Sequence, residues 1–134
     1  MHNDRARAVI CKDGKILLMH RTRKGVTFYV LPGGTVEKGE TPEITVMREV
    51  KEETSLDTTL SKKLITLNTI DGITHHIYEC KYNSGFPMIA PDSPEKNDSD
   101  NTYELLWIEP SQLPSLHMWP AEIKPFLIEY FSKK

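Results

Sequence analysis

The chain has 134 residues, of which 38% are hydrophobic and 27% are charged, and its formal net charge is −2. These values are typical of one globular domain with its own core, and the length is too short for two. The near-neutral charge gives no general attraction to nucleic acid or to a membrane surface, so we expect neither as a stable partner. No apolar run approaches the ~20 residues that cross a bilayer, and the N-terminus becomes charged too soon for a signal peptide. The expected location is the cytoplasm.

The first forty residues predict three strands and a glycine-rich loop. Residues 5–22 have the pattern of a hairpin, because two apolar-rich runs flank Asp13-Gly14, a strong turn signal. Residues 27–31 predict a third strand, which ends at Pro32-Gly33-Gly34. The loop over residues 33–41 contains three glycines and three charged residues.

The next stretch predicts a helix and a second hairpin. Thr41 suits the N-cap and Pro42 the first helical position, and the helix is expected to run to about Thr54. Residues 58–70 and 73–82 flank an Asp-Gly turn and predict the second hairpin.

The remainder predicts a long loop over residues 84–101, a strand over 102–108 and a closing amphipathic helix over 119–131. Cys11 and Cys80 lie in apolar strand-like runs and are expected to be buried, structural thiols. Hairpins and two helices in this order favour a mixed sheet covered by helices, in a layered α/β or α+β domain.

Three carboxylates crowd one side of the first predicted helix. At 100° per residue, Glu49, Glu52 and Glu53 lie within a sector of about 100°. At these spacings like charges cost roughly 0.2–0.5 kcal/mol a pair, and the last turns of a helix favour cations instead. Arg48 can neutralise only part of this repulsion. A solvated charged face is the ordinary interpretation of such a helix, and a metal site is the alternative.

A metal site explains more of the sequence than a solvated face does. Hard oxygen ligands without His or Cys suit Mg²⁺ or Mn²⁺, which turn the mutual repulsion into coordination. A solvated helix has no use for a glycine-rich loop, whereas Gly33 and Gly34 let the backbone come close to an ion and present carbonyls to it. The pattern therefore favours a metal site.

The same region has the spacing of a known motif. Its positions are Gly34, Glu40, Arg48-Glu49-Val50, Glu52-Glu53 and Ser55-Leu56. This pattern resembles the Nudix box, with eight of the nine specified positions met across 23 residues. More loosely, the whole chain is similar to a single-domain, MutT-like member of that family. The resemblance implies one Nudix hydrolase domain over residues 1–134, with its box over residues 34–56.

The resemblance also implies a fold, a reaction and a set of site residues. The fold is α/β, a sandwich of helices around a mixed β-sheet. The reaction is the hydrolysis of a nucleoside diphosphate linked to another moiety, with Mg²⁺ or Mn²⁺ as the cofactor. By position, the metal ligands are Gly33, Glu49, Glu52 and Glu53. The catalytic residues are Arg48, Glu52, Glu53 and Glu104, and the loop residues are Gly34 and Glu40.

The resemblance gives some of these residues individual roles. Arg48 orients Glu52 and balances its charge. Glu104 resembles a family acid that lies opposite the box and serves as a ligand or base, although an exposed strand acid is an alternative interpretation. In the implied reaction, metal ions activate a water molecule, and Glu53 or Glu104 takes its proton.

One position departs from the motif. The box has glycine where this chain has Ser55. A residue that follows a helix often adopts φ > 0, which costs a non-glycine residue roughly 1 kcal/mol. We therefore expect a strained helix end and slightly lower stability, without loss of activity.

Candidate substrate contacts lie outside the box. Arg5 and Arg7 share one face of the first predicted strand, and Arg21 lies near the end of the second. Each could hold a phosphate, although solvated cations on edge strands are the favoured interpretation. Tyr29 is a candidate for the pocket wall, and His75-His76 places one imidazole on each face of a strand. The proposed substrate contacts are Arg7, Arg21 and Tyr29.

The substrate follows only by elimination. Markers that accompany other substrates in this family are absent downstream of the box, which leaves a nucleoside triphosphate cleaved to the monophosphate and pyrophosphate. A nucleotide sugar and an RNA 5′ end are alternatives. A catalytically silent domain that senses a nucleotide is a further alternative, although the acids of the box are intact. The expected partner is a small nucleotide substrate, and a homodimer is left open.

Overall fold

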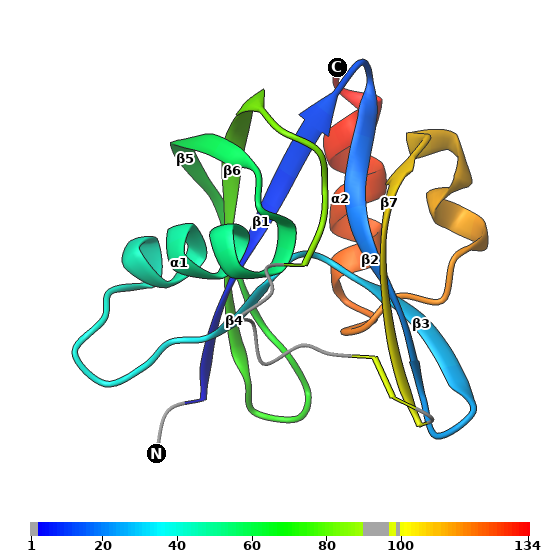
Figure 1. Ribbon diagram of the computed structural model, residues 1–134, viewed down its shortest axis with the longest axis horizontal. Coiled ribbons are helices and arrows are strands. Elements are labelled where there is room, and N and C mark those ends of the chain that lie inside the picture. Colours follow the sequence, from blue (N-terminus) through cyan, green and yellow to red (C-terminus); the bar gives the residue numbers. More distant parts are fainter. Residues whose placement is uncertain (1–2, 90–96, 99) are drawn as a thin grey trace.

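The computed structural model describes residues 3–89, 97–98 and 100–134 (Figure 1). Its strands are β1 (Asp4–Lys12), β2 (Lys15–Arg23), β3 (Val26–Val30), β4 (Gly33–Thr35), β5 (Asp57–Asn68), β6 (Thr74–Ser84) and β7 (Asn101–Ile108). Its helices are α1 (Pro42–Thr54), the short 3-10 helix η1 (Pro110–Ser115) and α2 (Ile123–Ser132). Among the described helices, none has the length and apolar character needed to cross a membrane.

Within the described residues, seven strands join one mixed sheet. Its main path runs β3-β2-β1-β6-β5, with β4 paired to β1 and β7 paired to β2. Strands β1 and β6 are parallel, and the other described pairs are antiparallel. Both predicted hairpins are present, as β1–β2 and β5–β6.

The first hairpin opens soon after its turn. Strands β1 and β2 pair only where Cys11 faces Ile16 and Lys12 faces Lys15. Beyond these pairs, β4 takes the place beside β1, and β3 takes the place beside β2. Figure 1 shows β1 and β2 together at their turn and apart at their other ends. The sheet thus divides into two halves, and the predicted loop over 33–41 begins instead with a short strand.

Successive residues of β1 face two different cores. Ala8 packs in the cluster that contains Val50 of α1. Val9 packs in the cluster that contains Leu127 of α2. Because neighbouring side chains of a strand point to opposite faces, α1 covers one face of the sheet and α2 covers the other. This arrangement confirms the α/β/α sandwich.

The two long helices begin at different distances from their predicted starts. Helix α1 begins as predicted, and the Thr41 hydroxyl accepts a hydrogen bond from the Ile44 amide at 3.2 Å. The prediction that the last helix begins at residue 119 is wrong, since α2 begins at Ile123. The Trp119 amide donates to the Tyr29 carbonyl of β3 at 3.0 Å, and Met118 forms an isolated bridge with Tyr29, so this segment lies along the edge of β3 instead.

The predicted loop over residues 84–101 agrees with the structure in part. Residues 85–89 contain no helix or strand, whereas Ser84 ends β6 and Asn101 begins β7. Residues 90–96 and 99 lie outside the described residues. Both cysteines are free thiols as expected, with Cys80 buried and Cys11 partly buried.

Gly33 lets β4 lie against β1. Its φ of +153° lies in the region that favours glycine, and a Cβ built there would overlap the Ala6 carbonyl oxygen and lie 2.7 Å from the Arg7 Cα. Gly33 therefore has a packing role in addition to the role expected from the sequence. The space it preserves is filled by the backbone of β1.

We expect Gly33→Ala to lower the free energy of unfolding by about 3 kcal/mol, because it adds a steric overlap to backbone strain. The control is Gly39→Ala, since Gly39 has φ +86° but nothing within 4 Å of a built Cβ. That control should cost about 1 kcal/mol from strain alone. Denaturant unfolding measures both, and equal losses would contradict the packing argument.

Ser55 at the end of α1 has the expected left-handed conformation and also makes a contact that the sequence did not predict. Ser55 has φ 60° and ψ 12°, which confirms the left-handed cap. Its hydroxyl also donates to the Met88 carbonyl at 2.7 Å, and the Met88 amide donates to the Thr54 carbonyl at 2.9 Å. The serine side chain therefore fastens residue 88 to the helix end, which glycine could not do.

Two substitutions separate strain from this contact. Ser55→Gly should leave stability nearly unchanged, because relief of about 1 kcal/mol of strain offsets the loss of a hydrogen bond of similar value. Ser55→Ala keeps the strain, loses the bond and should cost about 1 kcal/mol. Thermal melts of both variants check this, and an unchanged Ser55→Ala protein would show that the hydroxyl contributes nothing.

Candidate active site

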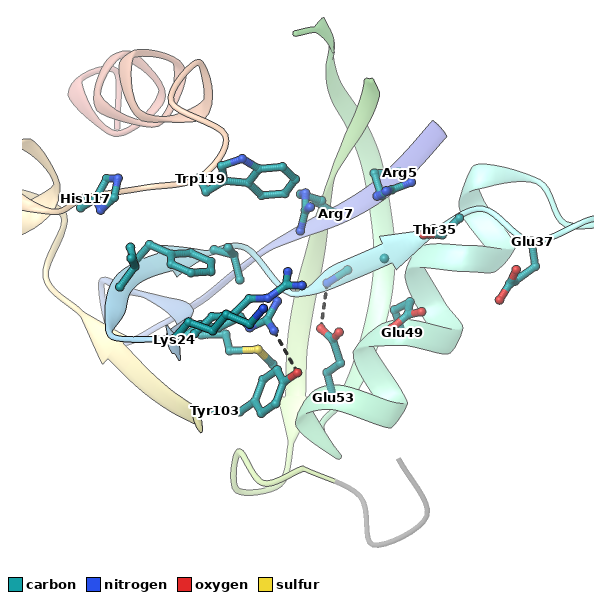
Figure 2. A pocket seen from close by; sticks show the side chains of 18 residues that line it. Arg5, Arg7, Lys24, Thr35, Glu37, Glu49, Glu53, Tyr103, His117 and Trp119 are labelled. Carbon is teal, nitrogen blue, oxygen red and sulfur yellow. Dashed lines mark hydrogen bonds between the residues drawn. The ribbon is translucent and has the colours of Figure 1, made fainter. Parts of the chain in front are cut away.

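A cavity of about 710 Å³ opens where the two halves of the sheet separate. Among the described residues that line it, the cations come from β1, β2 and the following turn: Arg5, Arg7, Arg21, Arg23 and Lys24. The carboxylates come from α1 and the loop before it: Glu37, Glu49 and Glu53. In the view of Figure 2, Arg5 and Arg7 lie on one side of β4, and Glu49 and Glu53 lie on the other. The cavity thus has a cationic wall and an acidic wall.

The acidic wall depends on both glycines of β4. Glu53 is only 5% exposed, and its Oε1 accepts a hydrogen bond from the Gly33 amide at 2.9 Å. This donor fixes the orientation of the carboxylate. A Cβ on Gly34 would lie 2.5 Å from Oε2 of Glu49, so only glycine leaves room for that carboxylate. Strand β4 therefore fixes two of the three box acids.

Arg48 holds the box acids and the loop together. Its Nε donates to Glu40 at 2.7 Å, and its Nη1 lies 3.0 Å from Glu49 and 3.3 Å from Glu52. The hydrogen bonds with Glu40, together with the charge of Glu49, raise the pKa of Arg48 above its ordinary value despite partial burial. The predicted contact between Arg48 and Glu52 is present, and the guanidinium is shared among three carboxylates.

Glu40 braces the loop, as the resemblance implies. It accepts hydrogen bonds from Arg48, from the Thr45 hydroxyl at 2.8 Å and from the Glu37 amide at 3.1 Å. Hydrogen bonding, first from Arg48 and then from Thr45, lowers the pKa of Glu40 from 4.5 to about 2. The loop before α1 is thereby tied to the helix by an ionised carboxylate.

The donor set of the acidic wall fits a hard divalent cation. Glu49 and Glu53 line the cavity. The Glu52 side chain is 35% exposed and pairs with Arg48, which also pairs with Glu49. Oxygen donors without His or Cys are what Mg²⁺ and Mn²⁺ prefer. Within the described part of the chain, no three acidic, His or Cys side chains already converge as a metal cluster. The Gly33 amide donates a hydrogen bond to Glu53, and the Gly33 carbonyl remains an expected metal ligand.

The cationic wall is more buried than the sequence predicts. Arg7 is only 5% exposed and lies on β1, which has β6 on one side and β2 and β4 on the other. The interpretation of Arg7 as a solvated cation on an edge strand is therefore wrong. Its desolvation lowers its pKa to about 10, with the charge of Glu53 opposing the shift. The side chain remains charged at neutral pH.

Arg21 also lines the cavity, as predicted for a substrate contact. Its Nη2 donates to the Tyr103 hydroxyl at 2.9 Å, and its guanidinium lies 4.4 Å from the centre of that ring. The expectation for Tyr29 is not supported. Phe28 lines the cavity, whereas Tyr29 stacks on His20 with ring centres 4.5 Å apart. Alternation along β3 places these neighbours on opposite faces.

Glu104 also requires correction. It does not belong to the described lining of the cavity, and its side chain is 65% exposed, with Oε1 3.8 Å from His20 Nδ1. The neighbouring residue of β7, Tyr103, faces the cavity instead. The structure thus favours the alternative interpretation, an exposed strand acid, and leaves Glu53 as the candidate base.

Several lining residues were not predicted, among them Tyr103, His117 and Trp119. Tyr103 follows from strand alternation once Glu104 is known to face outward. His117 and Trp119 come from the irregular segment after η1, which pairs with β3 through Tyr29. No local sequence pattern marks that pairing.

Comparisons with known proteins agree with this architecture. The model of the NUDIX domain matches residues 1–130 of the chain. A MutT-like protein of Streptomyces ambofaciens is 32% identical over 109 residues, which are 81% of this chain and 64% of that protein. An ADP-ribose pyrophosphatase of Bacillus subtilis (strain 168) is 34% identical over 70 residues, 51% of this chain and 38% of that protein. The chain thus spans less than two thirds of the length of either relative.

A solved structure extends the likeness to the whole fold. The crystal structure of a NUDIX-family hydrolase from Clostridium perfringens has a TM-score of 0.73 and covers 98% of this chain and 96% of that one. The two are 20% identical in sequence, so the likeness shows the fold alone.

The lowered pKa of Glu40 predicts a pH-dependent stability. Because the folded pKa lies below the ordinary value, ionisation stabilises the fold above about pH 4.5, and this contribution is lost as the pH falls toward about 2. We expect Glu40→Gln to lower the melting temperature at pH 7 and to converge with the wild type between pH 4.5 and 2. Melts followed by circular dichroism measure this.

The control for the pH series is Glu109→Gln, which removes an exposed carboxylate that lies 3.9 Å from Lys15. Its melting temperature should stay close to the wild type across the range. A Glu40→Gln deficit that persists unchanged at pH 2 would contradict the electrostatic origin of the bracing.

Proposed function

The chain belongs to the Nudix family, and on this premise we propose that it hydrolyses nucleoside diphosphate derivatives with a divalent metal ion. The observation that carries the proposal is the pair Glu49 and Glu53, which line the same cavity as five cations. A diphosphate held beside the acids would also meet the positive charge of the cations that line the same cavity. Both halves of the cavity thus suit an anionic substrate.

In this proposal, Glu49, Glu52 and Glu53 hold Mg²⁺ or Mn²⁺. Such an ion, held by these residues, would supply Lewis-acid chemistry to phosphoryl oxygens and to the attacking water. Glu53 accepts the proton of the attacking water, since it is the buried acid that the Gly33 amide keeps oriented. Arg48 is a positioning residue, because it contacts Glu49 and Glu52 and also ties them to Glu40.

We propose a nucleoside triphosphate as the substrate, cleaved to the monophosphate and pyrophosphate. The cationic wall supports this choice, because a triphosphate carries more charge than a diphosphate linked to a neutral sugar. One relative is an ADP-ribose pyrophosphatase, which makes nucleotide sugars the natural comparison substrates. RNA 5′ ends belong in the same assay, and the reaction itself requires no macromolecular partner.

We expect Glu53→Gln and Glu52→Gln each to lower turnover by about 10²-fold or more, because each removes charge from the proposed metal site. The assay measures phosphate or pyrophosphate release from a panel of triphosphates and nucleotide sugars with Mg²⁺ or Mn²⁺. The control is Glu43→Gln, which alters an acid of the same helix that accepts a hydrogen bond from Tyr78 at 3.0 Å.

The control variant should keep a rate within a few-fold of wild type. Near-wild-type turnover by Glu53→Gln on the best substrate would contradict its role as base. A wild-type protein that binds nucleotides but releases no product under any of these conditions would instead indicate the silent sensor.

A further inference from the structure

Arg7 is a buried cation whose described hydrogen-bond partners are neutral. Its Nε donates to His75 Nδ1 at 3.1 Å, and its Nη1 donates to the Leu31 carbonyl at 3.1 Å. The ring centre of Trp119 lies 5.4 Å from the guanidinium carbon. These contacts fix the direction of the side chain without cancelling its charge.

Arg48 shows the contrasting arrangement in the same site. Its guanidinium is shared among Glu40, Glu49 and Glu52, so its charge is neutralised by carboxylates of the protein itself. Arg7 forms no such ion pair among the described residues, although the more distant charges of Glu53 and Glu49 favour its ionised form. A buried charge without a close counter-ion costs stability, and it is compensated when an anion binds beside it.

His75 is built to hold Arg7 in this way. To accept from Arg7, Nδ1 must be unprotonated, so the ring proton lies on Nε2. Burial, with the charge of Arg7, lowers the pKa of His75 to about 4 and keeps the ring neutral at physiological pH. The Nε2 atom is buried without a described hydrogen-bond partner, and the ring meets Trp119 edge to face with centres 5.9 Å apart. His75 therefore offers Arg7 a neutral acceptor, Nδ1, while its own Nε2 donor has no described hydrogen-bond partner.

From these contacts we infer that Arg7, positioned by His75 and Trp119, binds an anionic group of the substrate beyond the metal-bound diphosphate, and so selects triphosphates over diphosphates with a neutral substituent. The inference deepens the proposed function and rests on it for the position of the diphosphate. Arg7 lines the cavity on the opposite side of β4 from the acids (Figure 2). A ligand that reached both walls would pair its outer charge with Arg7. A neutral group there would leave the buried cation uncompensated.

Calorimetric titration tests this without requiring turnover. Inorganic tripolyphosphate and pyrophosphate are titrated into the protein with Mg²⁺ present in both experiments. The wild type should bind tripolyphosphate about 10- to 100-fold more tightly, the value of one charge-assisted contact. In Arg7→Met, the ratio of the two affinities should fall close to one. A wild-type ratio near one, or an unchanged ratio in Arg7→Met, would overturn the inference.

The matched control is Arg23→Met, which removes the same charge from the same cavity at an exposed position. It should keep most of the tripolyphosphate preference, because its charge is screened by water. An equal loss in Arg23→Met and Arg7→Met would mean that the cavity responds only to total charge, and it would overturn the assignment to Arg7.

Two variants of His75 test its role as a positioning residue and protect the experiment if Arg7→Met does not fold. His75→Phe removes the acceptor and should lower the tripolyphosphate preference several-fold, whereas His75→Asn retains an acceptor and should restore most of it. Kinetics on a nucleoside triphosphate should show the loss in KM and not in kcat. Equal behaviour of Phe and Asn variants would overturn the positioning role.

The results of these measurements distinguish a failure of the Arg7 inference from a failure of the proposed function. If the protein hydrolyses none of the tested nucleotides but shows the Arg7-dependent preference, the anion site is supported and the proposed reaction is contradicted. If the protein hydrolyses triphosphates and nucleotide sugars, and Arg7→Met reduces both rates equally, the proposed reaction is supported and the selective role of Arg7 is contradicted.

Discussion

The site depends on the close approach of the β4 backbone to β1. Strand β2 leaves β1 just after the turn, and β4 fills the vacated position through only three pairs, from Arg5 to Arg7. Gly33 permits this approach, and its amide then orients Glu53. A single short strand therefore separates the sheet into two halves and aligns the acids of α1 with the cavity between them.

The two arginines of the site illustrate different uses of one chemical group. Arg48 offsets repulsion among carboxylates that would otherwise strain the helix, and so it allows three acids to stand together on α1. Arg7 is held by a neutral imidazole and a carbonyl, so its charge still acts on the cavity. The choice of partner, carboxylate or neutral acceptor, decides whether a guanidinium supports structure or faces a ligand.

Local features were predicted from the sequence more successfully than those that depend on pairing between distant segments. Helix α1, its Thr41 cap and the left-handed Ser55 are specified within a few residues, so their patterns suffice. Tyr29 and Glu104 were misplaced because the face of a strand residue is set by its neighbours in the sheet, and a one-residue difference reverses it. The burial of Arg7 follows from the central position of β1, which requires the parallel pairing with β6, and no local motif encodes that pairing.

The burial of Arg7 also has an energetic meaning for recognition. An exposed arginine must lose side-chain freedom when it grips a ligand, which subtracts from affinity. In Arg7 that ordering is completed during folding, because His75, Leu31 and Trp119 already fix the side chain. The fold bears the cost as a desolvated charge and an unpaired Nε2 on His75. Such local departures from an ideal core persist where the surrounding packing enforces them, and here that packing is the junction of β1, β6 and the segment before α2.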